Sequence, residues 1–194
     1  MIKIDNYIYL SEKDKQITSV GFSKKEIKNH KGISGLKYYL IILYLRKHVQ
    51  TFGQVTLTLN DLLQEIGYST NTNNKSIYSD FREIIKTEII NKGYGKCDRD
   101  IFVVKPNDLF HIQLSDENNI FFTEDNFVQI TISEYESICF ISSKINKSIL
   151  LGIYIFIKQY IMDYQGDIVP AKISFPSKSQ IAKGLDTSIS TVEN

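Results

Sequence analysis

Few side chains in this sequence stand at the spacings that catalysis or metal binding requires. The two carboxylates of "DRD" at residues 98–100 could mimic a metal site, but the neighbouring sequence offers no third ligand. The histidines His30, His48 and His111 are isolated, and none stands in a His-x-x-x-His or His-x-Glu frame. The segment "GYGK" at 93–96 is too short for a phosphate loop. We therefore expect no enzyme, no cofactor and no metal.

A predicted amphipathic helix that starts near residues 73–75 carries the first set of candidate nucleic-acid contacts. The apolar positions of this helix share one face, and they are Ile77, Phe81, Ile84, Ile85 and Ile89. The candidate DNA contacts are Asn73, Asn74, Lys75, Ser76, Tyr78, Ser79 and Arg82. Asn and Arg suit bidentate contacts to adenine and guanine, and the first amides of a helix could meet a phosphate. Asp80 and Glu83 dilute the positive field, so an ordinary solvated helix face fits this pattern as well.

A predicted hairpin follows that helix and carries the second set of candidates. The sequence "NKGYGKCDRDIFVVKP" indicates a charged tip, a return strand over Ile101–Val104 and an end at Pro106. The candidate contacts of this wing are Lys92, Tyr94, Lys96 and Arg99. Asp98 and Asp100 oppose them, and a tip of mixed charge is also typical of any solvated turn.

The closing segment, "ISFPSKSQIAKGLDTSISTVEN" at residues 173–194, has the pattern of the first helix and turn of a helix-turn-helix. Its candidate DNA contacts are Ser177, Lys178, Ser188, Ser190 and Thr191. A capped helix pair with a purely structural role remains the alternative. A helix of four or five residues is not stable alone in water, so we expect the chain to be a fragment of a longer protein.

The elements around these candidates follow one order. An apolar helix (34–53), a short strand (55–59), a helix capped by Asn60, the helix near 75–89 and the hairpin give the order of a winged helix. The segment "NKSILLGIYIFIKQYIM" repeats the apolar density of "GLKYYLIILYLRKHV", and "KISFPSKSQIAKGLDTS" aligns with "LTLNDLLQEIGYS". A helix before this second central helix begins with Ser133 as cap and Glu136 three residues later.

The predicted fold class is α+β and mainly helical, with two tandem winged helix-turn-helix units, the second truncated at its C-terminal end. The first unit spans residues 1–108, with a strand-containing extension at its start. Residues 109–136 form a connecting β-hairpin, because "FHIQL" and "FVQITI" alternate like two strands. Residues 137–194 form the second, incomplete unit.

Composition sets limits on location and partners. The net charge is +1, so a DNA-binding face must come from local segregation of charge. Cys97 and Cys139 lack metal-ligand spacing and indicate no disulfide scaffold, which favours a reducing cytoplasm. The apolar run Ile149–Ile157 is about half the length of a membrane span. We expect a cytoplasmic protein that does not contact a membrane.

The pattern as a whole resembles the tandem winged-helix replication proteins of low-GC Gram-positive bacteria and of their plasmids and phages. That group includes plasmid replication initiators and DnaD-type replisome organisers. The resemblance implies sequence-specific binding of double-stranded DNA, with replication proteins such as a helicase or its loader, and a second copy of the chain, as further partners. A transcriptional regulator and a protein-interaction scaffold without DNA contact remain alternative functions, because the same fold serves all three.

Overall fold

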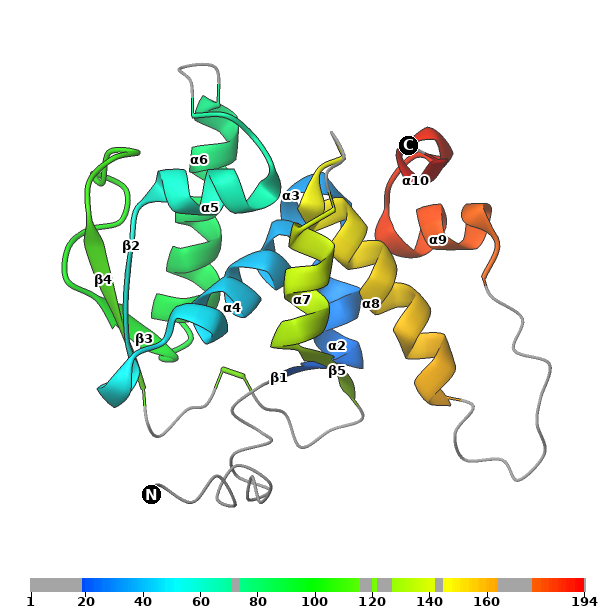
Figure 1. The fold of residues 1–194 in the computed structure, drawn as a ribbon, viewed down its shortest axis with the longest axis horizontal. Coiled ribbons are helices and arrows are strands. Elements are labelled where there is room, and N and C mark those ends of the chain that lie inside the picture. Colours follow the sequence, from blue (N-terminus) through cyan, green and yellow to red (C-terminus); the bar gives the residue numbers. More distant parts are fainter. Residues whose placement is uncertain are drawn as a thin grey trace, which may run out of the picture.

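The computed structural model describes residues 19–70, 74–115, 120–121, 127–141, 145–163 and 176–193. Within these ranges the chain is an α+β fold, mainly helical, with two small antiparallel sheets (Figure 1). This confirms the predicted fold class at the level of secondary structure. The expected alternation of apolar residues at the start of the chain, from Ile2 to Leu10, lies outside the described residues.

The elements before residue 116 include five helices and four strands of the described chain. The helices are α2 (Lys24–Asn29), α3 (Gly32–Gly35), α4 (Lys37–His48), α5 (Leu59–Ile66) and α6 (Lys75–Ile84). The strands are β1 (Ser19–Ser23), β2 (Gln54–Leu57), β3 (Gly95–Cys97) and β4 (Phe110–Leu114). A 3-10 turn, η2 (Thr51–Gly53), precedes β2, and a π-helical turn, η3 (Ile85–Ile90), extends α6. The later elements are β5 (Phe127–Thr131), α7 (Ile132–Cys139), α8 (Lys147–Asp163), α9 (Lys178–Leu185) and α10 (Ile189–Glu193).

The helix α4 is the centre of the fold. Its residues from Lys37 to Leu45 are all buried, because the helix is apolar nearly all round and packs against neighbours on several sides. The helices α5 and α6 and the strand β2 lie against one part of its surface, and α7 and α8 against another (Figure 1). The close approach of α8 leaves little room at Gly152, since a Cβ there would lie 2.6 Å from Leu36 Cδ2 and that side chain would have to shift.

The elements α4, β2, α5, α6, η3, β3 and β4, which we call the first unit, build one sheet in the order β2-β4-β3. Leu57 of β2 faces Phe110 of β4, and Cys97 of β3 faces Ile112 of β4, both in antiparallel register. The predicted return strand over Ile101–Val104 is wrong, because this segment is a turn and the strand comes later, at β4. The turn forms because the Asp100 carboxylate accepts the amide of Phe102, while the Asp100 carbonyl accepts the amide of Val103.

The predicted connecting hairpin at 109–136 is also wrong. Its two strands are present, but β4 joins β2 and β3, whereas β5 pairs with β1, with Ser19 opposite Thr131. The predicted boundary at residue 108 therefore separates β4 from its own sheet. The alternation of apolar residues along a strand indicates which side chains face the core, but it does not indicate which other strand pairs with it.

Helix starts follow local capping, at positions that differ from two of the predictions. Thr58, not Asn60, caps α5 and forms a reciprocal pair with Asp61. Thr131 caps α7 with Glu134, two residues before the predicted cap at Ser133. The predicted end of α5 at Gly67 is confirmed, with the glycine in the left-handed conformation at φ 96°.

The helices α8, α9 and α10 form what we call the second unit. Helix α9 crosses α8 so closely that a Cβ on Gly184 would lie 2.1 Å from the ring of Phe156. The short helix α10 begins after Ser188, whose hydroxyl accepts the Thr191 amide at 3.1 Å. Among the residues that the structure describes, no helix combines the length and the apolar character that a bilayer span requires.

Candidate nucleic-acid interface

The helix α6 is anchored to the core by apolar side chains and by one ion pair. Phe81 is fully buried on the face that meets α4 and α5, and Ile85 and Ile89 continue this face into η3. Asp80 reaches the buried ammonium of Lys37 at 2.7 Å. The Asp80 carboxylate is therefore partly neutralised by α4, and it dilutes the positive field of α6 less than the sequence suggests.

The outer face of α6 presents only part of the predicted set of DNA contacts. Lys75, Ser76 and Ser79 are exposed. Asn74 is buried instead, and its side-chain amide donates to the Ser69 carbonyl at 2.9 Å, which braces the turn between α5 and α6. Asn73 lies outside the described residues.

Tyr78 and Arg82 do not stand on the free face that the helical spacing predicts. Tyr78 is 5% exposed, and its hydroxyl donates to Asn60 Oδ1 at 2.5 Å. Burial raises the pKa of this phenol above its ordinary value, so Tyr78 is a neutral donor. Arg82 is half-buried and donates from Nη2 to the Val104 carbonyl at 2.8 Å, which fastens the β3–β4 loop to α6. A helical projection could not find these partners, because they lie 18 and 22 residues away in sequence.

The wing candidates, like the candidates on α6, differ in how free their side chains are to contact DNA. Lys96 on β3 and Arg99 beyond it are exposed, and Arg99 Nε lies 3.8 Å from its neighbour Asp98. Lys92 forms an ion pair with Glu88 one turn earlier, at 2.5 Å. Tyr94 is half-buried against the core, so its ring is less available to a sugar than a free wing residue would be.

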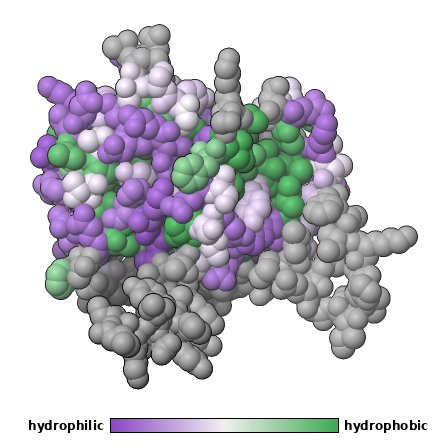
Figure 2. Space-filling model, viewed as in Figure 1, coloured by the Kyte–Doolittle hydropathy of each residue, from purple (hydrophilic) through white to green (hydrophobic). Residues whose placement is uncertain are grey.

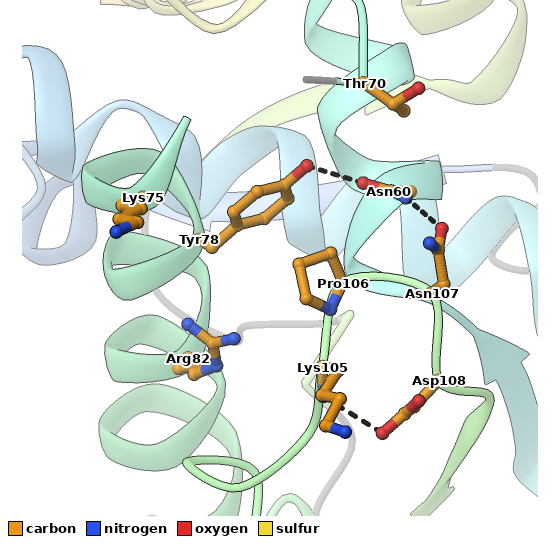
Figure 3. A pocket seen from close by; sticks show the side chains of 9 residues that line it. All are labelled: Asn60, Thr70, Lys75, Tyr78, Arg82, Lys105, Pro106, Asn107 and Asp108. Atoms are coloured by element: carbon orange, nitrogen blue, oxygen red, sulfur yellow. Dashed lines mark hydrogen bonds between the residues drawn. The ribbon is translucent and has the colours of Figure 1, made fainter. Parts of the chain in front are cut away.

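A groove lies between α6 and the loop that precedes β4 (Figure 3). Its volume is about 920 Å³, and we call it the α6 groove. The residues that line it are Asn60, Thr70, Lys75, Tyr78, Arg82, Lys105, Pro106, Asn107 and Asp108. Sequence reasoning named Lys75, Tyr78 and Arg82 but missed the others, and the only local signal for them was the turn sequence "KPND" at 105–108.

Hydrogen bonds fix one wall of the α6 groove. The Asn60 side chain accepts from Tyr78 and donates to Asn107 Oδ1, and the Asn60 backbone amide donates to the Pro106 carbonyl at 3.0 Å. The loop is closed by the Asp108 carboxylate, which accepts the Lys105 amide at 3.1 Å. The groove therefore has a preformed shape set by α5, α6 and the loop together.

The candidates of the second unit gather at the two ends of α9. Ser177 caps α9 by accepting the Gln180 amide at 3.3 Å, and the neighbouring Lys178 forms an exposed ion pair with Glu193 at 3.2 Å. Ser188 accepts the amide of Thr191 and lies 2.8 Å from the Ser190 hydroxyl. The start of α6 and the corner between α9 and α10 both lie toward the top of the view in Figure 1.

The surface differs in character between the two units. Figure 2 shows hydrophilic residues over most of the side where the first unit lies, and hydrophobic residues gathered over α8 and its neighbours. Phe140, directly after α7, is a large apolar side chain with 83% exposure.

Comparisons of this chain with protein-family models, with curated proteins and with solved structures find no match.

Proposed function

We propose that the chain binds double-stranded DNA in a sequence-specific manner, and that the first unit acts as a winged helix with α6 in the major groove. The support for this is topological. The first unit runs helix, strand, helix, helix, strand, strand, with the sheet order β2-β4-β3, and this order supports a winged-helix arrangement. In this arrangement α6 follows the turn after α5 as the reading helix, and the β3–β4 loop becomes the wing.

One observation carries the proposal most directly. Helix α6 is held against the core by Phe81 and by the pairing of Asp80 with Lys37, while Lys75, Ser76 and Ser79 stay exposed on its first two turns. A helix that presents its N-terminal turns as a polar, cationic ridge suits the major groove. Lys96 and Arg99 would add phosphate contacts from the wing.

The second unit would extend the contact to a neighbouring site. The helix, turn and short helix formed by α9 and α10 would place Ser188, Ser190 and Thr191 toward DNA. Two units joined in one chain raise each other's affinity through effective concentration. We propose replication initiation of a plasmid or phage as the process, on the strength of the sequence resemblance, with transcriptional regulation as the alternative.

The binding test is fluorescence anisotropy with a labelled duplex taken from the DNA that flanks the gene. The double variant Lys75→Ala/Lys96→Ala removes two exposed cations without touching a buried contact. Each lysine that neutralises a phosphate contributes about 1 to the magnitude of the negative slope of log K against log salt concentration. The magnitude of that slope should therefore decrease by about 2 in the double variant. Arg82→Ala is a poorer probe, because it also frees the β3–β4 loop.

Lys25→Ala on α2 is the control, since Lys25 is also an exposed lysine but lies outside the first unit. Its salt slope should equal that of the parent protein. No binding at low salt, or an unchanged slope in the double variant, would contradict the proposal and favour a protein-interaction scaffold. A reporter plasmid whose only origin is the flanking DNA separates replication from transcription.

A further inference from the structure

We propose that the α6 groove binds one nucleoside monophosphate unit, either as a free nucleotide or as an unpaired nucleotide of a DNA strand. This site goes beyond duplex binding, because a base inside a duplex cannot enter a concave groove. The volume of about 920 Å³ falls within the range of about 300 to 1,000 Å³ that is typical of small-molecule sites.

The charge of the groove selects an anion. Lys75, Arg82 and Lys105 all line it, and its single acidic residue, Asp108, is engaged by the backbone amide of Lys105. In the described part of the chain, neither Lys75 nor Lys105 takes part in an ion pair. Arg82 Nε is buried and has no hydrogen-bond partner among the described residues. This nitrogen is shielded from solvent, so Arg82 attracts a phosphate through its charge, while the exposed Lys75 and Lys105 can contact the phosphate directly.

The apolar part of the groove selects a flat ring. Figure 3 shows the rings of Tyr78 and Pro106 at the same space, with Lys75 and Arg82 to one side and Lys105 below. The hydrogen bond to Asn60 fixes the Tyr78 ring, which is only 5% exposed, so a base would lie mainly against the half-buried Pro106 ring and meet only the small exposed part of Tyr78. Phosphate binding alone would not require this apolar surface.

An amide beside these rings can read the edge of a base. Asn107 is exposed, and its side-chain oxygen accepts from Asn60. This bond leaves the Asn107 amide nitrogen to donate to a ring carbonyl, and Figure 3 shows that nitrogen on the side of Pro106. A pyrimidine with a carbonyl next to its ring nitrogen matches one donor at this place.

The experiment is an NMR titration of the full chain with thymidine 5′-monophosphate, thymidine and inorganic phosphate in parallel. We expect the nucleotide to bind at least tenfold more tightly than either fragment, and its thymine methyl signal to shift on binding. In Lys105→Ala the nucleotide should bind about tenfold more weakly, whereas in Lys183→Ala, an exposed lysine of α9, it should bind unchanged. No saturable shift with the nucleotide, or equal affinity in Lys105→Ala and the parent, would overturn the site.

A second arm identifies the source of the nucleotide. A four-nucleotide thymidine strand is titrated beside the mononucleotide, and a clear gain for the strand supports unpaired DNA, while equal affinity supports a free effector. Neither titration contains duplex DNA, so failure of this site leaves duplex binding untouched. Conversely, a loss of duplex binding in Lys75→Ala/Lys96→Ala says nothing about Lys105.

Discussion

At the scale of residues, three half-buried carboxylates are held by partners on other elements. Asp80 meets Lys37, Glu65 accepts the hydroxyl of Tyr135 at 2.7 Å, and Glu134 lies 2.6 Å from the ammonium of Lys158. Each of these pairs joins helices that are distant in sequence. Partial burial raises the cost of removing one member, because the other is then left without its partner.

Glu134 gives the chain a stability that depends on acid pH. Burial alone would raise the pKa of this carboxyl, but hydrogen bonds from Lys158, Tyr154 and the Thr131 amide outweigh burial and lower the pKa to about 2. A depressed carboxyl pKa stabilises the folded state above the unfolded pKa near 4.5 and loses that contribution as pH falls toward 2. The free energy of unfolding should therefore fall over this window.

The measurement is urea unfolding of the parent and of Glu134→Gln between pH 2 and pH 7. With a side chain that is 29% exposed, solvent screening leaves a difference on the order of 1 to 2 kcal/mol at pH 7. The two proteins should converge near pH 2. A difference that is constant across the whole range would show that Glu134 acts through packing and not through its charge.

Exposure on α6 shows what the sequence can and cannot predict about single residues. The 3.6-residue period correctly places Phe81, Ile85 and Ile89 inside and Lys75 outside. It fails at Tyr78, which periodicity assigns to the free face, because the hydroxyl finds a partner in Asn60 on another helix. The α6 groove was missed for the same reason, since it depends on a loop 20 or more residues away from α6.

At the scale of elements, helices were easier to predict than strand partners. The apolar positions of α4, α5, α6 and α8 are local signals: α4 and α6 lie within the predicted ranges, while α5 begins before its predicted cap and α8 ends one residue later than predicted. The capping residues of helices were harder to predict. At the start of α7 the sequence offers both Thr131 with Glu134 and Ser133 with Glu136, at the same capping-box spacing. The pairing of β5 with β1 joins strands more than 100 residues apart, and no local pattern reports it.

The contact between α8 and α9 makes a prediction at this scale. Because a Cβ at Gly184 would lie within 2.1 Å of the buried Phe156 ring, Gly184→Ala should push α9 away from α8. Overpacking of this kind costs about 1 to 3 kcal/mol, although alanine favours the helix by about 1 kcal/mol. Thermal unfolding followed by circular dichroism measures the net loss.

The neighbouring exposed residue Lys183 provides the control for this contact. Lys183→Ala makes a change of side chain in the same turn of α9 without approaching Phe156, and it should leave the midpoint nearly unchanged. The double variant Gly184→Ala/Phe156→Leu should recover part of the loss, because the smaller side chain leaves room for the new methyl group. A Gly184→Ala protein as stable as the parent would mean that α9 does not pack on α8 as described.

At the scale of the whole molecule, the two units share one core. Helix α4 of the first unit packs directly on α8 of the second, with Gly152 against Leu36. Lys47 on α4 lies 3.7 Å from Glu65 of α5 and 3.5 Å from Glu136 of α7, so one ammonium joins three helices. The sequence indicated two units with similar central helices, but the joining of these helices into a single core depends on shape complementarity that periodicity does not encode.

A shared core predicts that the described helices unfold together. Tyr135 is fully buried on α7, and its hydroxyl donates to Glu65 of the first unit. Tyr135→Phe removes this hydrogen bond and the contact of the same hydroxyl with the Cys139 thiol, which together should cost about 1.5 kcal/mol because the main acceptor is a carboxylate. If the core is cooperative, that loss appears equally in both units, as about a tenfold fall in the protection of the slowest amides of α4 and α8.

Hydrogen exchange followed by mass spectrometry measures this protection. The control is Ser137→Ala, on the exposed face of α7, which should change the protection of neither α4 nor α8. A fall in protection confined to α7 and α8 would mean that the units unfold separately, and the fixed spacing of the two proposed DNA-reading helices would then lose its physical basis.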